Sequence, residues 1–241
     1  MQPGVKSLLL LLICLGVFDA TSIRAQSGRA PARPGTDARS ANDAPPDARP
    51  ANDAQPVVHL DAAGNFDGTV YKNSSLGFSV TVPKGWEVQD KEVERAFASG
   101  AAEQTREIAG SEQSANESID RTRLLFIAIK SSETNFNPSV IAMSEDISLA
   151  FDIRSSHQYI ARLRSAAART PLVFEPETAD ETINGVSFGV VGAASVSQAG
   201  KVRQRYYVAI FKHQALLFIL TFHDDAQLKT CRELLASIKS Q

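Results

Sequence analysis

Cysteine is scarce in this chain: among its 241 residues only Cys14 and Cys231 are cysteines. Cys14 lies in an apolar leader, so a processed chain would keep Cys231 alone. A single thiol cannot form an intramolecular disulfide, and a disulfide framework is therefore excluded. The domain must instead be held together by an apolar core, for which the residues from position 57 onward are numerous enough.

An excess of positive charge is also absent, since 25 Lys and Arg oppose 27 Asp and Glu for a formal net charge of -2. Residues 1–25 contain Lys6, Arg24 and Asp19, so their removal takes the net charge to -3. This mild acidity gives no electrostatic footprint for nucleic acid or for an anionic lipid surface. Nucleic acid is therefore not an expected partner.

No apolar run is long enough to span a bilayer. The longest near the start, residues 8–17, follows Lys6 and ends before the small residue Ala25. This is the pattern of a secretory signal peptide over residues 1–25, cut between Ala25 and Gln26. We expect an exported chain, periplasmic or extracellular, with no transmembrane anchor after cleavage. A lipoprotein signal at Cys14 is disfavoured because the bulky Ile13 precedes it.

Residues 26–56 have almost no large apolar side chains and are rich in Ala, Pro, Asp and Arg. Two copies of one decapeptide follow each other at residues 37–46 and 47–56. Such a segment cannot bury enough surface to offset its ordering entropy, so we predict a disordered tether. Its prolines favour a semi-stiff, extended spacer.

The remaining residues, 57–241, are predicted to form one globular domain of alternating strands and helices. Period-two alternation and turn signals predict strands at residues 77–82, 86–88, 123–130, 140–147, 173–177, 181–183, 186–190, 205–211 and 216–222. Helices are expected over residues 91–119, with a frayed second half, after Ser155 and after Asp224. Gly189 and Gly192 fall inside a strand pattern and predict a bulge or a close-packing site.

The run at residues 216–220 is apolar on both faces, which predicts a central strand covered on both sides. Hairpin-like connections predict a mainly antiparallel sheet. The expected fold class is therefore α/β (α+β): a three-layer α/β/α sandwich with helices on both faces of that sheet.

One motif opens this domain: Tyr71-x-Asn73, followed by Gly77-Phe78-x-Val80-x-Val82-Pro83-x-Gly85-Trp86. It resembles the opening of the PsbP-like superfamily, which includes the extrinsic PsbP subunit of photosystem II and a Ran-binding nuclear import factor. Asn137-Pro138, with Glu145-Asp146 after it, resembles the second landmark of that family. The pattern from Tyr206-Tyr207 to the terminal helix is similar too.

The resemblance covers residues 71–239 and implies an antiparallel sheet with helices on both faces. It implies a bacterial exported member that binds protein partners or assists assembly, since few members of the superfamily are enzymes. The chain departs from plant PsbP in the long polar insert of residues 94–119 and in its Ala/Pro tether. Photosystem binding is therefore not carried over.

Motifs for catalysis are missing from the sequence. It has no G-x-S-x-G elbow, no phosphate-binding loop, no G-x-G-x-x-G and no H-E-x-x-H. The four His residues are dispersed, at His59, His157, His213 and His223. The densest polar cluster is His223-Asp224-Asp225, with Cys231 further along; a helix cap at Asp224 and a core position for Cys231 explain these residues better than a metal site does.

We therefore expect a secreted, non-catalytic binding or assembly module of a bacterial cell envelope, with no cofactor, no metal and no catalytic residue. The expected partner is a protein or another envelope component. Two alternatives stay open. One is a metal-dependent hydrolase that uses the region of His223, Asp224 and Asp225. The other is a carrier of a small apolar ligand, enclosed between the sheet and a helix.

Overall fold

The computed structural model describes residues 64–108, 111–132, 136–168, 170–197 and 200–240. The predicted signal peptide, with Cys14, Ala25 and Gln26, and the tether of residues 26–56 lie outside these ranges, as does the predicted domain start at residue 57. Within the described ranges, no helix combines the length and the apolarity that crossing a bilayer requires.

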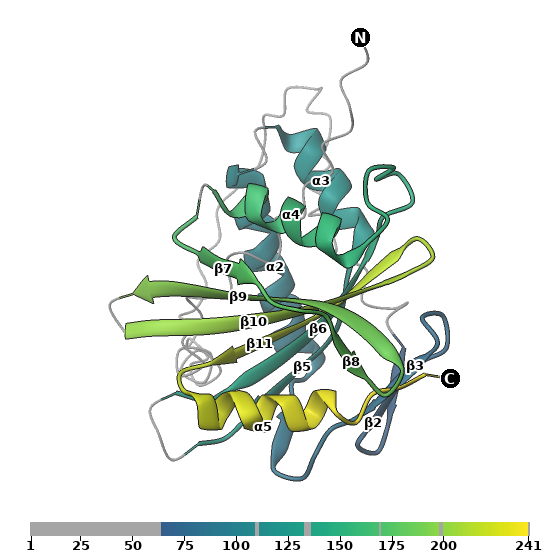
Figure 1. Cartoon of the computed structure of the whole chain (residues 1–241), viewed down its shortest axis with the longest axis vertical. Helices are drawn as coiled ribbons and strands as arrows, with labels where there is room; N and C mark the ends of the chain where they lie inside the picture. The colour runs from purple at the N-terminus through teal and green to yellow at the C-terminus, as the bar shows by residue number, and fades with distance from the viewer. Residues whose placement is uncertain (1–63, 109–110, 133–135, 169, 198–199, 241) are drawn as a thin grey trace, which may run out of the picture.

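An eight-stranded antiparallel sheet forms the centre of the domain (Figure 1). Seven strands lie in this order: β4 (Trp86–Val88), β5 (Thr122–Lys130), β6 (Ser139–Asp146), β11 (Gln214–Phe222), β10 (Gly200–Phe211), β9 (Val186–Ser197) and β7 (Val173–Glu177). The short β8 (Glu181–Ile183) pairs with β9 beside this path. The strands predicted at residues 186–190 and 205–211 are confirmed but longer, because β9 and β10 continue as one ladder to Ser197 and Gly200.

Strand β11 is the buried central strand that its sequence predicts. It pairs with β6 on one side and with β10 on the other, where Phe211 opposes Gln214 across a tight turn. Its residues 215–220 are almost completely buried. Because successive side chains point to opposite faces, Leu217 and Ile219 enter one core while Phe218 and Leu220 enter the other.

The two faces of the sheet are covered by different layers. One face packs against α2 (Lys91–Ile108), α3 (Glu112–Arg121) and α4 (Ser156–Ala167). The other packs against α5 (Asp225–Leu235) and the N-terminal strands. In Figure 1, α3 and α4 lie above the strands of the sheet and α5, in yellow, lies below them. The predicted α+β fold, with helices on both faces of an antiparallel sheet, is confirmed.

A second, four-stranded sheet completes the layer on the α5 side, which the sequence did not predict. Its order is β1 (Asn65–Asp67), β2 (Val70–Asn73), β3 (Phe78–Thr81) and β12 (Lys239–Ser240). The predicted first strand at residues 77–82 is β3, the third strand of the described chain. β3 belongs to the small sheet because it pairs with β2 and with the C-terminal β12.

The expectation of one helix over residues 91–119 with a frayed second half was wrong. The structure has two helices, and α3 begins with its own cap, where the Ser111 hydroxyl accepts from the Ser114 N–H at 3.2 Å. Ala115 and Ile119 of α3 are fully buried. Small residues such as Ala115 give a weak sequence signal, yet they let a helix pack closely, so tertiary contact stabilises a segment whose propensity looked marginal.

The caps predicted for the two later helices are confirmed. The Ser155 hydroxyl accepts from the Gln158 N–H at 3.3 Å, and Asp224 Oδ1 accepts from the Gln227 N–H at 2.8 Å. The Gln158 side chain accepts from the N–H of Arg154 at 2.7 Å rather than from that of Ser155, so the capping box is shifted by one residue.

Gly189 is the close-packing site that the strand pattern predicted. A Cβ atom placed there would lie 2.7 Å from the Cβ and Oγ of Ser156 and 3.1 Å from Cδ1 of Ile160. The missing side chain lets the first turns of α4 rest directly on β9. Gly192 is not packed against a helix in this way. A Cβ atom placed there would meet the exposed side chain of Glu175.

Candidate binding groove

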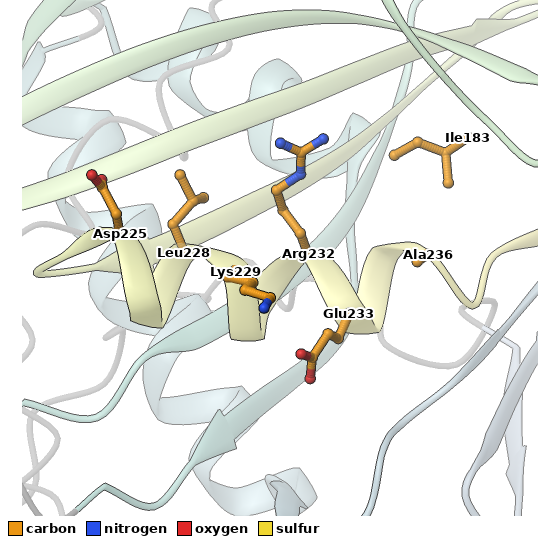
Figure 2. A pocket seen from close by; sticks show the side chains of 7 residues that line it. All are labelled: Ile183, Asp225, Leu228, Lys229, Arg232, Glu233 and Ala236. Carbon is orange, nitrogen blue, oxygen red and sulfur yellow. The ribbon is translucent and has the colours of Figure 1, made fainter.

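A surface groove of about 440 Å³ runs along the outer side of α5, next to β8. Figure 2 shows Leu228 and Arg232 rising from α5 toward the side on which Ile183 lies. Seven residues line the groove: Ile183, Asp225, Leu228, Lys229, Arg232, Glu233 and Ala236. Except for Ile183, all of them come from α5 or from its C-terminal cap.

The amphipathic pattern of α5 explains why the groove has this lining. Cys231, Leu234 and Leu235 of α5 are fully buried against the sheet. The opposite side of the helix leaves Lys229 and Glu233 exposed. The groove lies where these two sides meet, so it has an apolar floor and a charged rim.

Two ion pairs fix charged side chains around the groove. Arg232 binds Glu181 of β8, with 2.6 Å between Nη2 and Oε2. At the start of α5, Arg203 binds Asp225, with 2.8 Å between Nη1 and Oδ1. The Arg203 guanidinium also lies 5.0 Å from the centre of the Phe222 ring. The rim therefore presents both signs of charge.

Tyr207 of β10 links this rim to the sheet. Its hydroxyl donates to Glu181 at 3.4 Å, and its pKa is raised by burial first and by the charge of Glu181 second. The phenol is therefore protonated at neutral pH and acts as a hydrogen-bond donor. It holds Glu181 in place for the ion pair with Arg232.

The turn between β8 and β9 holds the C-terminal end of α5. The side-chain amide of Asn184 donates to the carbonyls of Ala236 and Ile238, each at 2.8 Å. Asn184 and Gly185 both have positive φ, 47° and 84°, as their Asn-Gly sequence predicts for a tight hairpin turn. The position of the groove is thus set by the hairpin and by α5 together.

His223, Asp224 and Asp225 have separate roles. Asp224 caps α5, Asp225 binds Arg203, and the ring of His223 lies 5.7 Å from the ring of Phe136. Within the described ranges, no group of three or more His, Cys, Asp or Glu residues could hold a metal ion. The alternative of a metal-dependent hydrolase in this region finds no support in the geometry of these residues.

Cys231 lies in the core, where the stripe of α5 predicted it. Its thiol is 3.8 Å from the carbonyl oxygen of Ser139, and burial raises its pKa to about 12. A thiol with so high a pKa carries almost no thiolate at neutral pH, which disfavours a nucleophilic role.

The landmark residues of the opening motif shape the turns of the small sheet. Asn73 is buried, donates to the hydroxyl of Tyr71 at 3.0 Å and accepts from the N–H of Leu76 at 2.9 Å. Gly77 has a φ of 67°, and Phe78 next to it is buried in the core. These residues support the fold and lie outside the lining of the groove.

The other landmarks lie at the starts of two strands of the main sheet, β4 and β6. Gly85 has a φ of 84° directly before Trp86, the first residue of β4, and the Trp86 N–H donates to the Pro83 carbonyl at 3.2 Å. Asn137 Oδ1 accepts from the N–H of Ser132 at 2.9 Å, and the Pro138 carbonyl accepts from the backbone N–H of Lys130 at 2.9 Å. They too have structural roles.

The groove was not predicted from the sequence. Residues 181–183 have the pattern of a short strand, and the last helix has the apolar stripe of a core element. The exposed positions Asp225, Lys229, Arg232 and Glu233 recur at helical spacing, which is a visible signal for one solvent-facing side of a helix. Nothing in the sequence placed that side of the helix next to β8, which ends 42 residues before Asp225.

No family model matches the chain, and a comparison with curated proteins finds no match. Among solved structures, CyanoP, the cyanobacterial PsbP of Synechocystis, has a TM-score of 0.41 at 12% identity, over 76% of this chain and 99% of that one. LpqN of Mycobacterium tuberculosis, described as involved in cell envelope biogenesis, has a TM-score of 0.36 at 12% identity, over 66% of this chain and 78% of that one.

A protein of Bacteroides thetaiotaomicron has a TM-score of 0.41 at 10% identity over 73% of this chain. The chain spans about half of that protein's length, 49%. A PsbP is thus among the solved structures to which this chain is similar. These likenesses concern the fold alone.

Proposed function

We propose that the chain is an exported, non-catalytic binding or assembly module of a bacterial cell envelope, and that it holds a protein partner in the groove beside α5. The observation that carries this proposal is the composition of the groove. Leu228 and Ile183 offer an apolar floor, while Lys229 and Glu233 remain exposed on the rim. An apolar centre with a polar rim is the usual anatomy of a protein interface.

The groove would bind a segment of the partner that has one apolar side chain with positively and negatively charged residues beside it. The apolar side chain would occupy the floor next to Leu228. Its charged neighbours would contact Lys229 and Glu233, whose side chains are exposed. Arg232 and Asp225 are already engaged by Glu181 and Arg203, so they fix the shape of the groove. The signal peptide and the tether predicted from the sequence would deliver the domain outside the cytoplasm and hold it apart from neighbouring structures.

A pair of matched substitutions tests the groove. Ala236→Arg would place a long side chain over the groove, and arginine at the end of a helix is well tolerated. Ala161→Arg adds the same side chain on an exposed position of α4, across the sheet. Crosslinking of the full chain in envelope extract should capture a specific protein with the wild type and with Ala161→Arg, and at least tenfold less of it with Ala236→Arg.

Equal capture by all three chains would show that the groove is not the recognition surface. A chain that captures no specific protein under repeated crosslinking would count against the binding role itself. Circular dichroism of both variants provides the folding control, since neither substituted side chain points into the core.

A further inference from the structure

Two large apolar side chains project into solvent from the loop between β6 and α4. Leu149 is 49% exposed and Phe151 is 78% exposed. We call these two residues the apolar tip. Val173, on β7, is the other large apolar residue that is exposed within the described ranges, at 70%. Two of three such residues thus lie within one short loop.

The loop is anchored, so this exposure is built into the fold. Ile147, Ala150 and Ile153 point inward and are buried in the core beneath α4. Leu149 and Phe151, between them in the sequence, point outward. A connection that needed only to link β6 to α4 would gain nothing from large apolar residues at these outward positions.

Hydrogen bonds satisfy much of the loop's backbone. The N–H of Ala150 donates to the carbonyl of Ile147, and the N–H of Ile153 donates to the carbonyl of Ala150, each at 2.9 Å. The N–H of Ser148 donates to Oδ1 of Asp146 at 2.8 Å. Unsatisfied backbone groups are what makes a loop costly to place in an apolar medium, so these hydrogen bonds lower that cost.

Two exposed basic residues belong to the loop of the tip and to a turn beside it. The turn between β10 and β11 lies beside the loop, since the His213 carbonyl accepts from the Ile147 N–H at 2.8 Å. Lys212 and His213 of that turn are exposed, and so is Arg154 at the end of the loop. Asp152 is the exposed carboxylate here, while Asp146 is occupied by the N–H of Ser148.

We propose that the apolar tip inserts Leu149 and Phe151 into the surface of a lipid bilayer, with Lys212 and Arg154 reaching the headgroup phosphates. Long basic side chains keep their charge at the phosphate level while their stems cover apolar surface. The net charge of the whole chain gave no reason to expect lipid binding. The reason lies in the local arrangement of exposed apolar side chains next to basic residues. The proposal is independent of the groove beside α5, which lies on the other face of the sheet.

The geometry favours a bilayer over a second copy of the chain. The tip projects two exposed apolar side chains, and a symmetric contact between two tips would bring the Lys212 and Arg154 of both copies together. Like charges in such a contact repel each other. A bilayer surface accepts exposed apolar side chains without requiring a matching hollow, and its phosphates complement the basic residues of the loop and the neighbouring turn.

Sedimentation with vesicles of phosphatidylcholine and phosphatidylglycerol in a 3:1 ratio tests the proposal. The full-length chain is compared with Phe151→Ser, Leu149→Ser and the control Val173→Ser. The apolar run of residues 8–17 is present in every variant and contributes equally. We expect about a tenfold lower partition coefficient for Phe151→Ser, a smaller loss for Leu149→Ser and no change for Val173→Ser. Equal partitioning of all four chains would overturn the proposal.

Fluorescence gives a second readout, specific to the tip. Trp86 is the one tryptophan of the chain. In Phe151→Trp, vesicles with brominated acyl chains should quench the added tryptophan, whereas Trp86 of the wild type should stay unquenched. Absence of quenching in Phe151→Trp would contradict insertion. A mass measurement without vesicles that shows oligomers of the wild type but monomers of Phe151→Ser would assign the tip to self-association and overturn the proposal as well.

Discussion

The carboxyl group of Glu145 accepts a hydrogen bond from the hydroxyl of Tyr159 at 2.8 Å, deep between the sheet and α4. Glu145 is near the end of β6 and Tyr159 is in the first half of α4, so the bond closes the base of the loop that carries the apolar tip. Both side chains are almost completely buried. Burial raises the pKa of Glu145 to about 7, although Tyr159, Arg162 and Arg121 oppose the shift.

This pKa predicts that the folded chain loses stability as pH rises from about 4.5 to about 7. In that window the folded state keeps the proton on Glu145 while the unfolded state has released it, so the unfolded state gains relative stability. The loss should be on the order of 3 kcal/mol and level off above pH 7, where both states are ionised. Urea unfolding between pH 4.5 and pH 8 measures it.

Two variants separate Glu145 from the other titrating groups. Glu145→Gln keeps the shape and removes the proton equilibrium, so its stability should lack this part of the slope. Tyr159→Phe removes the hydrogen bond that favours the carboxylate, so the slope should extend to higher pH. If Glu145→Gln retained the full slope of the wild type, the assignment to Glu145 would be wrong.

Gly189→Ala should destabilise the chain by about 1–3 kcal/mol, because the new Cβ would press on Ser156 and Ile160 and push α4 off the sheet. Gly192→Ala, in the same strand, is the matched control. There the added Cβ meets the flexible side chain of Glu175, which can move aside, so the cost should stay below about 1 kcal/mol. Thermal unfolding of both variants tests this order, and similar losses would contradict it.

Asn184→Asp should destabilise the fold by about 1–3 kcal/mol, because the amide donates to two carbonyls and a carboxylate cannot. Asn184→Gly keeps the positive φ and removes both hydrogen bonds without adding a charge. The expected order of stability in denaturant is wild type, then Asn184→Gly, then Asn184→Asp. An Asn184→Asp chain as stable as the wild type would mean that the turn does not hold the end of α5.

Much of the local structure could be predicted from the sequence because its causes are local. The polar cap at Asp224, the Asn184-Gly185 turn and the alternation of Val186, Phe188 and Val190 each depend on a few neighbouring residues. The small sheet could not be predicted in this way. Its last strand, at Lys239, pairs with Ser79, and no local pattern encodes a contact between residues so far apart in sequence.

The sequence by itself determined the caps at Ser155 and Asp224, the strands of the main sheet, and that the run at residues 216–220 is covered on both sides, because side-chain periodicity and capping act over a few residues. Only the tertiary structure decided which residues from distant segments lie next to each other. It placed Ile183 beside Leu228 to form the groove, and it bonded Glu145 to Tyr159 beneath an exposed Phe151. These juxtapositions follow from the packing of whole layers, which depends on the summed burial of both cores rather than on any one segment.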